Sequence, residues 1–468
     1  MDNILLELNQ FCKKILTYKS INEIIKKNKK GTYMRNSVKN GKGLTIIDAL
    51  LFKFTYLLKS KTKDKVASSL QKISGIYEQT SYTDKENNIP VEIYKLLWEK
   101  IYELTNSYVN DISKNKIHII AFDGTNNNDL KMNVCLNMGC FDVTNNLPIL
   151  FISYGSKNRN KEIEKAIEMI KSKKNDFKKS ILVFDRFYFS YGFMKFLIDN
   201  KIKFIIRARK DAKYLDDDLH IVNNTKNKKT IALIKPLTRV IKFNETYSKI
   251  IYSKKTKKNE SQKYVFDIQN DCVLITNISK SYNDETIMKF YRSRWDIETY
   301  FKLVKYNLKF QHIKDKTEAQ ISKTNYCILI YTTLCKLIKK HKLLTLKASK
   351  IKHKRNNTQI ECDSSINESL LIEIISEDLI KNMLEGKLTY DIILNIEKQL
   401  RIIKNEPNRS NPRTSKTPFT KWNVKGYSIN SQIVKILRLL NEEIKDSLNK
   451  NLKLIMNKIT LTSVSVYK

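Results

Sequence analysis

The sequence predicts an α/β fold: a core of alternating strands and helices, interrupted by a β-rich insertion and flanked by helical N- and C-terminal regions. Two observations support this prediction. Short apolar, β-branched runs bounded by polar turn residues alternate with amphipathic helical patterns between residues 113 and 210. Long stretches before and after that region follow the helical period instead. A chain of 468 residues is long enough for several domains.

The core is expected in two parts, residues 113–210 and 283–350. The first part contains helical patterns at 161–173 and 189–201, and the second contains a strongly apolar helix at 322–340 that is expected to pack on the sheet. Strands are expected at 117–122, 133–141, 148–153, 181–184 and 202–206. Three strands, a helix, a strand, a helix and a strand follow the order of an RNase H-like fold.

The insertion is expected at residues 211–282, where the alternation of strands and helices stops. This segment instead holds a series of short β-like runs. The runs are 220–224, 229–236, 238–243, 248–253, 262–268 and 272–277.

The N-terminal region, residues 1–112, is expected to be helical, with a mostly buried helix at 44–58 and a longer one that begins near Pro90. Two interpretations of this region stay open. One is a basic helix-turn-helix unit that binds DNA, and the other is an ordinary helical bundle.

The C-terminal region, residues 351–468, is also expected to be helical, with an extended basic, proline-containing linker at 405–422. The linker is followed by a final helix at 428–457, which is a candidate dimerisation element.

Two aspartates lie at the ends of predicted strands. Asp123 follows the apolar run 117–122, and Gly124 after it allows a sharp exit of the chain. Asp185 follows the run 181–184 in the same way. Strands that lie side by side bring their C-terminal residues together, so the two carboxylates are expected to be neighbours. A strand-terminal aspartate is also a common turn or cap residue, which is the structural alternative for each of them.

A tyrosine, an arginine, a glutamate and a lysine are spaced along the segment 289–310 at steps of three, four and seven. They are Tyr291, Arg294, Glu298 and Lys305. If the segment is one helix, these side chains project within roughly 60° of one another. An apolar stripe runs beside them at helical spacing. It consists of Ile297, Phe301, Val304 and Leu308.

This spacing resembles the YREK signature of the insertion-sequence-four family of DDE transposases, in which the glutamate is the third catalytic carboxylate. The resemblance implies that Asp123, Asp185 and Glu298 are catalytic. It implies cleavage of double-stranded DNA at the terminal inverted repeats of a mobile element, strand transfer into target DNA, and a homodimer in the synaptic complex. After the second aspartate the family often has Arg-Gly-aromatic, whereas this chain has Phe187 at the glycine position.

The remaining residues of the signature are Tyr291, Arg294 and Lys305, which the resemblance assigns to phosphates near the scissile bond. It also implies that Arg207 and Arg209 contact DNA. Both arginines lie on one side of an extended run, and solvated charge at the end of a strand is the alternative interpretation for them.

Three carboxylates at one point repel one another unless a cation joins them. Oxygen ligands of this kind suit Mg²⁺ or Mn²⁺. Two such ions can activate a water or a 3′-hydroxyl and stabilise the leaving oxygen at phosphorus. We therefore expect two Mg²⁺ or Mn²⁺ ions held by Asp123, Asp185 and Glu298.

The formal net charge is +39, from 87 Lys and Arg against 48 Asp and Glu. Such a charge favours a polyanionic partner, although heavy use of Lys, Asn and Ile also follows from AT-rich coding. The sequence has no apolar stretch long enough to span a membrane and no signal-peptide pattern, so an intracellular location is expected. Seven scattered cysteines without a CxxC pair suggest a reducing compartment.

Two other functions stay open at this stage. The first is a DNA-binding protein that descends from a transposase but no longer catalyses a reaction. The second is a metal-dependent nuclease that cuts DNA without joining it. Retained carboxylates argue against the first of these, and a joining assay separates the second.

Overall fold

The computed structural model describes residues 1–28, 44–59, 63–74, 79–112, 117–127, 135–155, 161–208, 225–252, 263–308, 310, 315, 317–345, 351–355, 358–366, 368–375, 379–400 and 402–405. The chain divides into two compact units, Met1–Glu406 and Pro407–Lys468. Every described residue lies in the first unit. The predicted final helix at 428–457 and nearly all of the predicted linker therefore lie outside the described residues.

The described strands β1 to β7 form one mixed sheet in the order β3-β2-β1-β4-β5-β7-β6. The strands are β1 (His118–Asn127), β2 (Cys135–Asp142), β3 (Leu147–Gly155), β4 (Ser180–Phe184), β5 (Lys203–Ala208), β6 (Arg239–Tyr252) and β7 (Lys263–Thr276). β1, β4 and β5 are parallel neighbours, and the remaining pairs are antiparallel. The five strands predicted for the first part of the core are confirmed.

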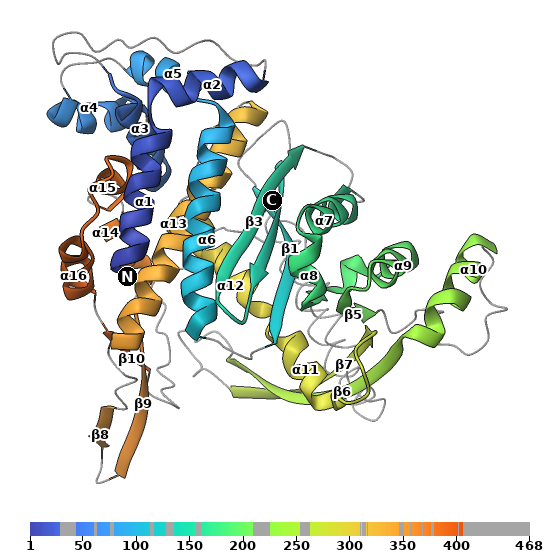
Figure 1. The fold of residues 1–468 in the computed structure, drawn as a ribbon. Helices are drawn as coiled ribbons and strands as arrows, with labels where there is room; N and C mark the ends of the chain where they lie inside the picture. The colour runs from blue at the N-terminus through green and yellow to red at the C-terminus, as the bar shows by residue number, and fades with distance from the viewer. Residues whose placement is uncertain are drawn as a thin grey trace, which may run out of the picture. The chain divides into compact units, whose positions relative to one another are not determined.

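Helices cover both faces of this sheet (Figure 1). On one face lie α7 (Lys161–Ser172), α8 (Lys174–Lys178) and α9 (Tyr191–Asp199), and on the other lie α6 (Val91–Ile112), α11 (Asp284–Arg292), α12 (Trp295–Tyr306) and α13 (Glu318–Thr345). Successive side chains of β1 point to opposite faces of the sheet, as in any β-strand. Ile120 and Phe122 pack with α7 to α9, whereas Ile119 and Ala121 pack towards α11 and α12. The fold is an α/β, RNase H-like core with helical flanks.

The described residues of the N-terminal region are almost entirely helical. The helices before α6 are α1 (Asp2–Ile15), α2 (Tyr18–Asn28), α3 (Ile46–Lys59), α4 (Lys63–Ser74) and α5 (Gln79–Asn88). The long helices α6 and α13 run side by side (Figure 1). The other side of α13 contacts β3, so the predicted packing of the apolar helix on the sheet is confirmed.

The segment between β5 and α11 differs in detail from the predicted series of short strands. Residues 229–236, predicted as a strand, lie largely in helix α10 (Thr225–Ile234), because Ile231 and Ile234 are one turn apart and both are buried beside α9. The four later runs merge into two long strands, β6 and β7, which form an antiparallel pair. β7 pairs with β5, so this pair extends the central sheet. The run 220–224 lies outside the described residues.

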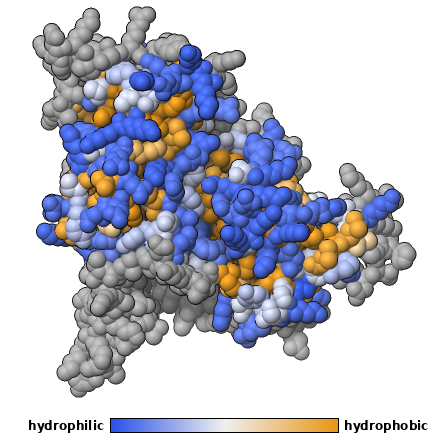
Figure 2. Space-filling model, viewed as in Figure 1, coloured by the Kyte–Doolittle hydropathy of each residue, from blue (hydrophilic) through white to orange (hydrophobic). Residues whose placement is uncertain are grey.

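Apolar residues are visible on the surface over α10 and the short turn that follows it (Figure 2). Leu233 and Leu237 are 60% and 56% exposed there.

The prediction of a helical C-terminal region, residues 351–468, is wrong in part. Three strands, β8 (Ile351–Arg355), β9 (Thr358–Ile366) and β10 (Ile402–Asn405), form a small antiparallel sheet. The sequence of β9 alternates apolar and polar residues at Ile360, Cys362 and their neighbours, which is the strand period. Helices α14 (Glu368–Ile374), α15 (Ile380–Leu384) and α16 (Tyr390–Gln399) fill the rest of the segment. In the described part of the chain, no helix is long and apolar enough to cross a membrane.

Candidate active site

The two predicted aspartates lie on neighbouring parallel strands at the same level. Phe122 of β1 is directly opposite Phe184 of β4, and their rings stack with centroids 5.0 Å apart. Asp123 directly follows Phe122, and Asp185 directly follows Phe184. By the period of a strand, Asp123 shares the face of Ile119 and Ala121, which is the face covered by α11 and α12. The prediction that β1 ends at Asp123 is wrong, since β1 continues to Asn127 and pairs with β2.

Asp185 begins a single 3₁₀ turn, η1 (Arg186–Tyr188), and its Oδ1 accepts a hydrogen bond from the backbone N–H of Phe187 at 2.7 Å. This turn explains how the chain accommodates phenylalanine where the resembled family often has glycine. Among the described residues other than glycine, a positive φ occurs only at Asn146 and Lys201, so Phe187 needs no left-handed conformation. Phe187 is 38% exposed, and its ring lies edge-on to that of Tyr188, with the centroids 5.9 Å apart.

The segment 289–310 is not one helix, as predicted, but two. α11 ends at Arg292 and α12 begins at Trp295. Between them the backbone hydrogen bonds join residues three apart, as in a 3₁₀ turn. The Arg294 N–H donates to the Tyr291 carbonyl and the Ile297 N–H donates to the Arg294 carbonyl, each at 3.1 Å. Arg294 therefore lies at the junction, as the residue before the first turn of α12.

The predicted apolar stripe is confirmed despite the break. Its four residues are at most 5% exposed and pack in the core between α12 and the sheet: Ile297, Phe301, Val304 and Leu308.

Arg294 joins two of the three predicted carboxylates. Its Nη1 lies 3.1 Å from Asp123 Oδ2, and its Nη2 lies 2.9 Å from Glu298 Oε1. The guanidinium carbon also lies 5.8 Å from the centre of the Trp295 ring, which is 60% exposed. Residues 171 positions apart in the sequence thus meet at one point.

The electrostatics of Asp123 reflect its position in this group. Burial raises the pKa of Asp123 to about 7, and the positive charge of Arg294 opposes this increase. The negative charges of Asp185 and Glu298 raise the same pKa further, so both lie close enough to act on Asp123. Burial lowers the pKa of Lys305, and the charge of Asp123 acts in the opposite direction. Lys305 of α12 is therefore within electrostatic reach of the Asp123 carboxylate.

Tyr291 lies within electrostatic reach of Arg294 but is buried. It is 6% exposed and packs with Ile119, Ile181 and other core residues. Arg207 of β5 forms a side-chain hydrogen bond with Tyr291, whose pKa is raised mainly by burial. Arg207 thus contacts a buried tyrosine next to the site. Arg209 lies outside the described residues.

The carboxylates suit a divalent cation by their chemistry, because all three offer hard oxygen ligands. Within the described residues, however, no group of three or more His, Cys, Asp or Glu side chains is arranged to hold a metal ion. The two ion pairs of Arg294 place its guanidinium between Asp123 and Glu298.

A fourth acidic residue, Glu162, lies near the two aspartates. It belongs to the first turn of α7, and its Oε1 accepts a hydrogen bond from the Tyr188 hydroxyl at 2.6 Å. No pattern in the sequence indicates this contact, because an acidic residue in the first turn of a helix is common for reasons of the helix dipole alone.

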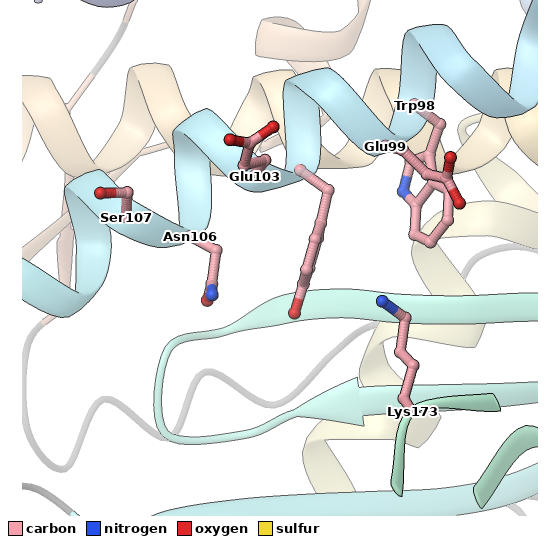
Figure 3. Close-up of a pocket in the computed structure, with 7 residues that line it drawn as sticks. Trp98, Glu99, Glu103, Asn106, Ser107 and Lys173 are labelled. Carbon is pink, nitrogen blue, oxygen red and sulfur yellow. The ribbon is translucent and has the colours of Figure 1, made fainter. Parts of the chain in front are cut away.

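A hollow of about 520 Å³ lies elsewhere, along α6 (Figure 3). It is lined by Trp98, Glu99, Tyr102, Glu103, Asn106, Ser107 and Lys173, and none of the predicted site residues is among them. The amino group of Lys173 lies 5.7 Å from the ring centre of Trp98 and 5.4 Å from that of Tyr102. Lys173 thus joins the corner between α7 and α8 to α6 by a cation–π contact.

Residues 138–335 match the family model described as a transposase DDE domain. No curated protein matches the chain. The matched residues include Asp185 and the segment from Tyr291 to Lys305, while Asp123 lies before them. Together with the RNase H-like fold, this match supports a DDE transposase, a class of DNA-binding polynucleotidyl transferases that generally use divalent metal ions.

Proposed function

We propose that this chain is a cut-and-paste DNA transposase of the insertion-sequence-four type, with Asp123, Asp185 and Glu298 as its catalytic carboxylates. The observation that carries this proposal is the pair of contacts through which Arg294 joins Asp123 of the sheet to Glu298 of α12, at 3.1 and 2.9 Å. The tyrosine–arginine–glutamate–lysine spacing adds support. So does the common level of Asp123 and Asp185 on parallel strands.

The transferred strand reacts by two displacements at phosphorus, and the other strand at each element end must also be cut, because cut-and-paste transposition releases the element from both strands. In the first, the oxygen of a water molecule attacks the phosphodiester at the element end. A new P–O bond forms, the bond from phosphorus to the 3′ oxygen breaks, and the proton lost by water is balanced by the one that the 3′ oxygen gains. In the second, the freed 3′-hydroxyl attacks a phosphodiester of the target DNA, whose own 3′ oxygen leaves. The second step exchanges one phosphodiester for another and needs no other reactant.

Asp123, Asp185 and Glu298 would hold two Mg²⁺ or Mn²⁺ ions, which supply Lewis-acid activation of the attacking and leaving oxygens. Arg294 forms an ion pair with each of two of these carboxylates, Asp123 and Glu298. When it leaves them, its guanidinium can bind a DNA phosphate with two parallel hydrogen bonds. Lys305 contributes a second positive charge on the same helix. Tyr291, which is hydrogen-bonded to Arg207, lies within electrostatic reach of Arg294.

DNA is the partner that the charge of the chain favours. A formal net charge of +39 steers polyanions towards the protein and releases counterions when DNA binds. We propose terminal inverted repeats and target DNA as the two substrates, bound by a homodimer in a synaptic complex.

The test is a cleavage and joining assay with labelled element ends, a target plasmid and Mg²⁺. Wild-type protein should cut the ends and join them to the plasmid. Glu298→Gln and Asp123→Asn should bind the ends with nearly unchanged affinity and yield neither product. Lys173→Ala, which changes a charge outside the site, is the matched control and should retain both activities.

Each alternative has a distinct outcome in this assay. Binding without cleavage under either Mg²⁺ or Mn²⁺ would identify a DNA-binding protein that lacks catalysis. Cleavage without joining would identify a metal-dependent nuclease. Joining by Glu298→Gln would remove Glu298 from the catalytic carboxylates.

A further inference from the structure

Glu162 contacts both of the chain segments that carry the predicted catalytic aspartates. The first contact is with η1, the turn that follows Asp185. Tyr188, the last residue of η1, is completely buried, and its hydroxyl donates a hydrogen bond to Glu162 Oε1 at 2.6 Å. Burial, followed by the charge of Glu162, raises the pKa of Tyr188 well above its usual range, so the hydroxyl stays protonated and remains a donor.

The second contact is with the backbone directly after Asp123. A Cβ atom placed on Gly124 would lie 2.5 Å from Glu162 Oε1 and 2.9 Å from its Oε2. The Glu162 carboxylate thus takes the space that any side chain at position 124 would need. A free glutamate could swing away from such a clash, but the hydrogen bond to the buried Tyr188 holds this one in place. Gly124 itself donates its N–H to Asp123 Oδ1 at 2.9 Å, so its backbone position also orients that carboxylate.

Glu162 acts from the side of the sheet opposite to Arg294. Successive residues of a strand face opposite ways, so Gly124 presents to α7 the face that Asp123 does not use. Tyr188 packs in the same cluster as α7 and α9, with Phe122 and Phe184. Arg294 and Glu298, in contrast, approach Asp123 from α12.

We propose that Glu162 is a positioning residue that fixes the spacing of Asp123 and Asp185. It does so through its carboxylate, which accepts the hydrogen bond of the Tyr188 hydroxyl and lies against the backbone of Gly124, so that η1 and β1 keep one relative position. It does not contact the reacting atoms. The catalytic consequence rests on the proposed function, whereas the geometric consequence does not.

Three variants separate positioning by a hydrogen bond from action by charge. Glu162→Ala removes the acceptor, and Tyr188→Phe removes the donor but keeps the ring. Each should lower the turnover of DNA cleavage on the order of 100-fold, because catalysis is sensitive to displacements of about 1 Å. Neither should change the KM for DNA ends more than about 2-fold. Glu162→Gln retains an acceptor oxygen of the same shape and should stay within about 5-fold of wild type.

The double variant Glu162→Ala with Tyr188→Phe should be no worse than Glu162→Ala alone, because the Tyr188 hydroxyl has already lost its acceptor in that single variant. Gly124→Ala should lower turnover in the wild-type background by displacing Glu162. It should have no further effect in the Glu162→Ala background, where the clash is gone. Glu164→Ala changes an exposed acidic residue of the same helix turn and is the matched control.

Crystal structures of these variants give a readout that does not depend on activity. The separation of the Asp123 and Asp185 carboxylates should change in Glu162→Ala and Tyr188→Phe and stay unchanged in Glu162→Gln. That result in a protein without cleavage activity would uphold the positioning role and refute only the proposed function. An unchanged separation in Glu162→Ala, or a loss in Glu162→Gln equal to that in Glu162→Ala, would overturn the positioning role.

Discussion

Two groups of charged residues in this protein, one buried and one partly exposed, differ in their balance of acids and bases. In the first, at the contact of α3, α5 and α13, Lys53 pairs with Asp315 at 2.9 Å and Lys323 pairs with Glu86 at 3.2 Å. All four side chains are at most 6% exposed, and hydroxyls of Thr324 and Tyr94 satisfy the acids further.

The second group is the candidate active site, where the acids outnumber the bases. Arg294 faces Asp123 and Glu298, with Asp185 near enough to raise the pKa of Asp123. The exposed fractions of the Asp123 and Glu298 side chains are 17% and 30%. In a buried group with equal numbers of acids and bases, each charge is paired within the group, and the pairs fix how the helices pack. An acidic excess that water can reach is suited to bind a cation.

The largest effect should come from breaking the balanced group. Asp315→Ala leaves Lys53 buried without its carboxylate and should lower the free energy of unfolding by about 3–5 kcal/mol. Urea unfolding measures this change. Glu99→Gln alters an exposed pair with Lys95 and should change the same quantity by less than about 1 kcal/mol. A loss below about 1 kcal/mol for Asp315→Ala would show that the group contributes little to stability.

The next effect is the pH dependence of the unbalanced group. The pKa of Asp123 is about 7 in the folded chain and 3.8 without perturbation, so the folded state binds this proton more tightly. Its contribution to stability is therefore fully present below pH 3.8 and is lost as the pH rises to about 7.

Asp123→Asn has no such proton to lose. Between pH 4 and pH 8 the wild type should lose up to about 4 kcal/mol of unfolding free energy that the variant does not lose, so the stability of the variant relative to wild type should increase by that amount. Urea unfolding of both proteins at the two pH values in a chelating buffer measures the difference. If the difference in free energy of unfolding between the two proteins is the same at pH 4 and pH 8, folding does not raise the pKa of Asp123.

A third prediction compares how the two groups respond to an added cation. Arg294→Gln removes two ion pairs and should cost about 2 kcal/mol at pH 8, less than a fully buried pair because water screens the site. Millimolar Mg²⁺ should restore most of this loss, because a cation can replace the guanidinium. Mg²⁺ should not restore Asp315→Ala, which lacks an acid rather than a base. If Mg²⁺ restores the stability of both variants equally, the two groups do not differ in their ability to bind a cation.

The smallest effect is expected at the hollow along α6. Lys173→Ala removes the cation–π contacts with Trp98 and Tyr102 and should cost about 1 kcal/mol. Thermal unfolding measures this cost, and DNA cleavage should be unchanged. A large loss of cleavage would mean that the α6 contact also supports the site.

The sequence predicted those parts of the site that follow from local patterns. Apolar runs placed Asp123 and Asp185 beside each other, and helical spacing identified the stripe from Ile297 to Leu308. The break between α11 and α12 was not predictable from spacing, because both sides follow the same helical period. It depends on hydrogen bonds at Arg294 that a periodic pattern does not reveal.

Two other features could not be predicted because they depend on long-range contacts. The helical conformation of residues 229–234 depends on packing of Ile231 and Ile234 beside α9. The role that we infer for Glu162 depends on Gly124 and Tyr188, which are 38 residues before it and 26 residues after it. No local pattern joins these three positions.

The most direct measurement is the anomalous diffraction of crystals soaked in Mn²⁺. We predict Mn²⁺ density adjoining the carboxylates of Asp123, Asp185 and Glu298, with Arg294 withdrawn from both of its acidic partners, and no density at Lys53 and Asp315. Absence of density at the three carboxylates, with Arg294 still bridging Asp123 and Glu298 in saturating Mn²⁺, would contradict the central claim that this acidic group is a cation-dependent catalytic site.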